Sequence, residues 1–117
     1  MQRLIADQDF DHRILRALHT RLPDASATTA LAIGFDREPD SASLRWVADN
    51  DAILLTQDDK TMHQAATARF DAGLPIARVV VVPQSMPLAQ AIAELVLLLT
   101  CGEPDDWVNG LVRLPLL

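Results

Sequence analysis

Apolar residues along this chain fall into short continuous blocks, separated by longer stretches in which they recur every three or four positions. Short apolar blocks bounded by polar or turn residues are typical of strands buried in a parallel sheet, and the helical spacing between them predicts amphipathic helices. Four consecutive valines make one block an especially strong strand candidate. The strands are expected at Gln2–Ala6, Ala27–Leu31, Ile53–Thr56, Arg78–Val82 and Leu111–Leu114.

Helices are expected between these strands, and turn or capping residues mark their ends. Alternating strands and helices imply right-handed crossovers and an α/β fold with a mostly parallel central sheet flanked by helices. With 117 residues and no interior linker, we expect a single domain over residues 1–117. The helices are expected from a cap at Asp7 or Asp9 to Pro23-Asp24, from Asp40 or Ser41 to about Asn50, from Asp58-Asp59 to about Ala72, and from Ser85 or Pro87 to Gly102.

The charge balance limits the classes of partner. The net charge is −6 and Lys60 is the only lysine, whereas proteins that bind nucleic acid tightly usually carry a basic footprint. This counts against extended RNA or DNA binding by a monomer and leaves room for a local patch, such as Arg13 and Arg16 on the first helix.

The remaining composition favours a soluble cytoplasmic protein. Cys101 is the sole cysteine, so the fold needs no intramolecular disulfide. The N-terminus becomes polar too soon for a signal peptide. The longest apolar stretch, Leu88–Cys101, is shorter than a membrane span and is interrupted by Gln90 and Glu94, so no membrane association is expected.

Aspartates follow the predicted strands at places where a parallel sheet could gather them. Asp7 follows the first strand, Asp58 follows the third, and Asp40 opens the helix after the second. Ligands of open parallel sheets bind beyond the carboxyl ends of the strands, so we expect these three side chains to share a site. The alternative for each aspartate is that it caps a helix.

A shared site of this kind predicts a bound cation. Neighbouring carboxylates repel one another unless a cation or proton lies between them, and oxygen ligands suit Mg²⁺ or Mn²⁺. Such an ion activates water for attack on a phosphodiester. Asp7, Asp40 and Asp58 are therefore the candidate catalytic residues and metal ligands, with Asp59 and Asp9 as neighbouring reserves.

Three motifs resemble those of a known family, the small PIN-like proteins of domain-of-unknown-function class 5615. The motifs are Leu4-Ile5-Ala6-Asp7-Gln8-Asp9-Phe10, the helix opening Pro39–Ala48 and the strand end Ile53-Leu54-Leu55-Thr56-Gln57-Asp58. Their order and spacing match over roughly residues 2–83, with the valine strand and Pro83 included. The resemblance implies a PIN-like domain, a metal-dependent ribonuclease acting on RNA, metal ligands at Asp7, Asp40 and Asp58, and the toxin of a bacterial toxin–antitoxin pair.

One departure from that family pattern supports a second hypothesis. The family continues thr-x-asp-x-asp-phe, whereas this chain places Lys60 at the second acid. Because function depends on the site rather than the fold, the chain could be a catalytically degenerate PIN-like module that binds a protein. Its partner would be an antitoxin-like protein, or a second copy of the chain bound through the apolar helix Leu88–Leu99.

Other chemistry fits the sequence less well. A response-regulator receiver would use Asp58 as phosphoacceptor but needs a late lysine, and none follows Lys60. A haloacid-dehalogenase-like phosphatase would use Asp7 and Asp9, but the chain leaves little room for its cap domain. The histidines follow no zinc pattern: His12 and His19 lie two helical turns apart, so we expect surface positions.

Overall fold

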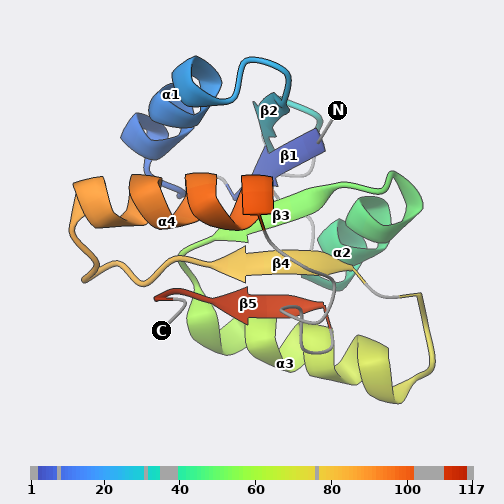
Figure 1. Cartoon of the computed structure of the whole chain (residues 1–117). Helices are drawn as coiled ribbons and strands as arrows, with labels where there is room; N and C mark the ends of the chain where they lie inside the picture. The colour runs from blue at the N-terminus through green and yellow to red at the C-terminus, as the bar shows by residue number, and fades with distance from the viewer. Residues whose placement is uncertain are drawn as a thin grey trace.

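All five strands run parallel, in the spatial order β2-β1-β3-β4-β5, and helices cover both faces of the sheet (Figure 1). The computed structural model describes residues 3–7, 9–30, 32–34, 40–75, 77–101 and 110–115, and of Asp40 and Asp59 the backbone only. The α/β class and the parallel sheet predicted from the sequence are confirmed. The elements are β1 (Arg3–Ala6), α1 (His12–Arg21), β2 (Ser26–Thr29), α2 (Asp40–Asp49), β3 (Ile53–Thr56), α3 (Asp59–Asp71), β4 (Arg78–Val81), α4 (Leu88–Cys101) and β5 (Leu111–Arg113).

The central strands are apolar because both their faces are covered. Every residue of β3 is buried, and so are the three valines of β4. Successive side chains of a strand point to opposite faces, so these strands feed two separate cores. Leu55 and Val80 belong to one core, and Leu54 and Val79 belong to the other.

The two cores assign each helix to a face of the sheet. Ile14 of α1 and Leu95 of α4 share the core of Leu55, whereas Leu44 of α2 and Met62 of α3 share the core of Leu54. Figure 1 shows the same arrangement, with α1 and α4 on the near side of the sheet. None of the helices in the described part of the chain is long and apolar enough to cross a membrane.

The direction of the chain through the sheet reverses between β1 and β3. The first crossover leads from β1 outward to β2, and the chain then returns past β1 to β3 on its other side. Such a reversal leaves a crevice at the carboxyl ends of the two central strands, where ligands of doubly wound sheets bind. The helix α3 begins at this carboxyl edge, because its cap Asp58 lies two residues beyond the end of β3.

The last crossover departs from the right-handed rule used in the sequence prediction. The chain moves from β4 to β5 in the opposite direction to its move from β1 to β2, yet α4 lies on the same face as α1. Two opposite moves over one face have opposite hands, so the β4-α4-β5 unit is left-handed, which is rare. On this face of the sheet, α4 packs against α1.

The helix ends follow the capping chemistry predicted from the sequence, with one correction. Asp58 caps α3, and Gly73 adopts φ +71° beyond its last turn, where its N–H donates to Phe70 O at 3.0 Å. The cap of α1, however, is Asp11, whose side chain accepts from the Arg13 N–H. Asp7 or Asp9 was expected there, but the Asp7 carbonyl accepts from Phe10 N–H, and this turn delays the helix start to His12.

Candidate active site

The buried side chain of Thr56 joins the ends of β1 and β3. Its hydroxyl donates a hydrogen bond to Asp7 Oδ2 and accepts one from the Asp58 N–H at 3.0 Å. The Asp7 N–H in turn donates to Leu55 O at 3.0 Å. Two of the predicted site residues, Asp7 and Asp58, are therefore linked through one residue at the point where the strand order reverses.

The strand pleat places this link on the face covered by α2 and α3. Leu54 packs on that face, and Thr56 follows it by two residues, so its side chain lies on the same side. The helix α2 covers this face and begins with Asp40, one of the two residues predicted to open it. The side chains of Asp40 and Asp59 lie outside the described part of the structure.

Asp58 serves as a helix cap in a position open to solvent. Its Oδ1 accepts from Thr61 N at 3.2 Å and its Oδ2 from Thr61 Oγ1 at 2.7 Å. The capping alternative considered for this residue is confirmed. Each carboxylate oxygen has more than one lone pair, so capping leaves Asp58 further acceptor capacity.

A second link ties the start of α1 to the end of β3. Gln57 Oε1 accepts from the Asp11 N–H at 3.1 Å, and Asp11 Oδ2 lies 2.8 Å from Arg13 Nη2. The hydrogen bonds from the Arg13 side chain and backbone, together with its charge, outweigh partial desolvation and hold the pKa of Asp11 below its ordinary value. Arg13, considered above for steering RNA, is thus partly engaged in holding this cap.

Sequence reasoning missed Thr56, Gln57 and Asp11 as organising residues. The only available signal was the hydroxyl at the end of an otherwise wholly apolar strand, since buried polar groups need partners. Asp9, named as a reserve ligand, is exposed. The three histidines His12, His19 and His63 are exposed, as expected.

The chemistry of the predicted ligands suits a hard cation, and the structure describes the side chains of two of them. Asp7 and Asp58 offer carboxylate oxygens, which Mg²⁺ and Mn²⁺ prefer. Among the residues whose side chains are described, no group of three or more His, Cys, Asp or Glu residues could hold a metal ion. The predicted third and fourth ligands, Asp40 and Asp59, fall outside that set.

A shallow hollow of about 540 Å³ lies at the start of α3. Lys60, His63 and Gln64 line it from the first turns of this helix, and Arg113 lines it from the end of β5. Those of its lining side chains that the structure describes are polar, and none of these is acidic.

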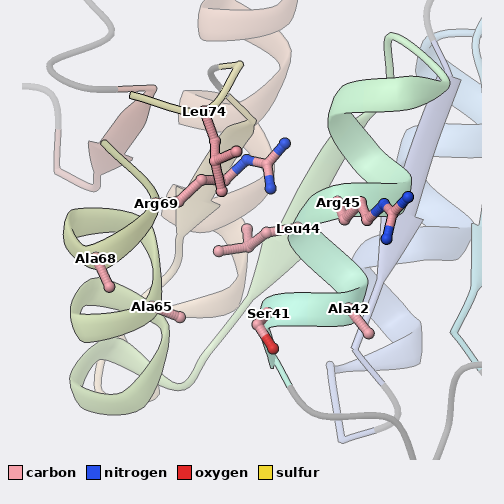
Figure 2. A pocket seen from close by; sticks show the side chains of 8 residues that line it. All are labelled: Ser41, Ala42, Leu44, Arg45, Ala65, Ala68, Arg69 and Leu74. Atoms are coloured by element: carbon pink, nitrogen blue, oxygen red, sulfur yellow. The ribbon is translucent and has the colours of Figure 1, made fainter. Parts of the chain in front are cut away.

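A second concavity of about 500 Å³ lies between α2 and α3 and is mainly apolar (Figure 2). In the close view, Leu44 points from α2 toward α3 and Arg69 points from α3 toward α2. The Arg69 Nε donates to Pro75 O at 2.7 Å, and the neighbouring Leu74 is 49% exposed. The groove is lined by Ser41, Ala42, Leu44, Arg45, Ala65, Ala68, Arg69 and Leu74.

No known family model, curated protein or solved structure matches this chain. The PIN-like resemblance rests on the three sequence motifs alone and stays a prediction.

Proposed function

We propose that this protein is a PIN-like, metal-dependent endoribonuclease whose site lies at the carboxyl ends of β1 and β3. The observation that supports the proposal most directly is the link from Asp7 through the Thr56 hydroxyl to Asp58 N–H, at the reversal of strand order. A place as the toxin of a bacterial toxin–antitoxin pair belongs to the same proposal and rests on the resemblance.

In this proposal Asp7, Asp40 and Asp58 hold Mg²⁺ or Mn²⁺. When bound, such an ion supplies a water of lowered pKa and offsets the negative charge that develops on a phosphodiester. The protein's own part is to fix the ligands. Thr56 directs its single hydroxyl proton at Asp7, and Thr61 holds the Asp58 carboxylate by two hydrogen bonds. Ligands fixed before binding lose little freedom when the ion and the RNA arrive.

The test combines metal binding with cleavage. Titration with Mn²⁺, followed by electron paramagnetic resonance, should show a bound ion, and the purified protein should cut single-stranded RNA in its presence. Asp58→Asn is the matched variant, because asparagine caps helices about as well as aspartate. It should fold normally and fail to cleave. A wild-type protein that neither binds Mn²⁺ nor cuts RNA at high enzyme concentration would refute the proposal.

The groove between α2 and α3 favours a second candidate, a protein-binding module without nuclease activity. Its floor is apolar, the charged residues in the described part of its lining are Arg45 and Arg69, and Leu74 leaves about half of its surface in solvent. Amphipathic helices dock in grooves of this character, and the arginines would pair with acidic residues of an antitoxin-like partner. Lys60 at the family's second acid position supports the same candidate.

The two candidates differ in what a partner assay shows. A module of this kind should co-purify from its native cell with one stable small protein, and Leu74→Asp should release that protein. Leu97→Asp is the matched control, because Leu97 is also an exposed leucine, 53% accessible, but lies on α4 at the other face. A partner-free protein that cuts RNA would exclude the binding candidate.

A further inference from the structure

The hollow beside the start of α3 adjoins the linked aspartates. Lys60 lies two residues beyond Asp58, and His63 and Gln64 follow one turn later on the same helix. From the other side, Arg113 stands in register with Val81 of β4, which stands in register with Thr56 of β3. Two strand spacings, roughly 10 Å, therefore separate the backbone of Arg113 from that of Thr56.

The pleat also places Arg113 on the correct face. Leu111 packs against the core of α2 and α3, whereas Val112 packs in the core of α1 and α4. Alternation puts Arg113 on the side of Leu111, which is the side of α3. The hollow is thus built by two elements far apart in sequence on the face that carries Thr56.

The charged side chains among its described lining residues are basic, in a protein of net negative charge. The chain has a net charge of −6 and one lysine, and that lysine lines the hollow together with an arginine and a histidine. Lys60 and His63 are exposed, so their donors reach solvent. The first turn of α3 adds the positive end of a helix dipole to this side-chain cluster. The ligand class that fits is an anion with several oxygen acceptors.

We propose that this hollow binds a backbone phosphate of single-stranded RNA, next to the scissile phosphate that a metal ion at Asp7 and Asp58 would bind. Its role in cleavage rests on the proposed nuclease function, but the binding itself requires no metal. The hollow is open and large enough for more than a lone ion, and basic grooves that track a phosphate backbone are the usual means of holding single strands. Lys60, which stands at the second acid position of the family motif, would then contact the substrate.

The test measures binding in the absence of metal. A fluorescent oligouridylate of about twelve nucleotides, within the usual site size for single-strand binders, is titrated in EDTA and followed by anisotropy. The variant Lys60→Gln/Arg113→Gln should bind at least about tenfold more weakly, and its plot of log affinity against log salt should be flatter by roughly 0.7 for each lost phosphate contact. Lys60→Gln alone should show part of the same loss, which keeps the test valid if replacing Arg113 harms folding.

A charge-matched control separates the hollow from general electrostatics. Arg3→Gln/Arg21→Gln removes the same charge from exposed positions on β1 and α1 and should change affinity less than about twofold, because contacts away from the bound strand are screened. Equal losses in both double variants, or none in Lys60→Gln/Arg113→Gln, would overturn the proposal. Inorganic phosphate that binds as tightly as the oligonucleotide would overturn the RNA assignment, since a free anion would then be the ligand.

Cleavage assays tell this proposal apart from the nuclease proposal. If both hold, the hollow variant raises KM and leaves kcat nearly unchanged, whereas Asp58→Asn lowers kcat. If the wild type binds RNA through the hollow but never cleaves it, the nuclease proposal alone fails. If the hollow variant cleaves with an unchanged KM, the hollow proposal alone fails.

Discussion

The Thr56 hydroxyl donates to the Asp7 carboxylate, so the last residue of β3 orients the acid that follows β1. Because the same hydroxyl accepts from the Asp58 N–H, its hydrogen-bonding capacity is divided between the two strand ends. A buried hydroxyl that donates one hydrogen bond and accepts another holds the two strand ends in a fixed relative position.

Thr56→Val tests these two hydrogen bonds with little change in side-chain shape. The valine removes the hydroxyl that donates to the Asp7 carboxylate and that accepts from the Asp58 N–H, so the free energy of unfolding should fall by about 1–3 kcal/mol. Thr56→Ser keeps the hydroxyl and should recover most of that loss. Urea denaturation of the three proteins provides the measurement, and equal stability of wild type and Thr56→Val would show that the hydroxyl holds nothing together.

Replacements at Asp58 separate its capping role from a role in the site. Asp58→Ala removes the acceptor for Thr61 N–H and should lower the free energy of unfolding by about 1 kcal/mol, whereas Asp58→Asn should keep most of that stability. Both should lower RNA cleavage by at least about 100-fold, because even outer partners of metal ligands are worth 10–100-fold. Thermal unfolding and cleavage are measured on the same samples. Cleavage that follows stability, lost in the alanine variant and kept in the asparagine variant, would assign Asp58 to capping alone.

Acid should selectively remove the contribution of the Asp11–Arg13 pair. The pKa of Asp11 is lowered in the folded protein, chiefly by its side-chain hydrogen bond to Arg13, from an ordinary value of 3.8. The folded state therefore binds a proton less readily than the unfolded state, and the pair stabilises the fold at pH values above 3.8 and loses that effect as pH falls through the lowered pKa.

Comparison with Arg13→Gln isolates this effect. The wild type should be the more stable protein at neutral pH, and its advantage should vanish in acid, as seen in urea unfolding over a pH series. The difference will be small because the Arg13 side chain is 63% exposed. If the wild type keeps the same stability advantage over Arg13→Gln well below pH 3.8, that advantage comes from packing rather than from charge.

Local sequence patterns predicted most of the helices and strands, because the residues that indicate each element lie within that element or at its ends. The block Ile53–Thr56 is a strand with those bounds, and Gly73 ends α3 because its positive φ suits a residue without a side chain. The positions of Asp7 and Asp58 at neighbouring strand ends also followed from the alternation of strands and helices.

Features that depend on contacts distant in sequence could not be predicted. Asp7, Asp9 and Asp11 offer the same capping chemistry, and the structure selects Asp11, whose N–H is bound by Gln57 at the far end of β3. Likewise, the periodicity of α4 shows which side of the helix is apolar but not which face of the sheet it covers. The left-handed crossover follows from the face of the sheet that α4 covers.

The packing of α4 against the α1 face can be tested with two leucines on the same helix. Leu95 is fully buried in the core shared with α1, whereas Leu97, two residues later, is 53% exposed. Leu95→Ala should lower the free energy of unfolding by about 2–5 kcal/mol through lost burial and the cavity left behind. Leu97→Ala should change it by less than about 0.5 kcal/mol, as surface substitutions do. Urea denaturation of both variants gives the comparison. Similar losses at the two positions would mean that Leu97 is covered as well, by a second copy of the chain or by another partner, and a concentration-dependent midpoint for the wild type would then identify self-association.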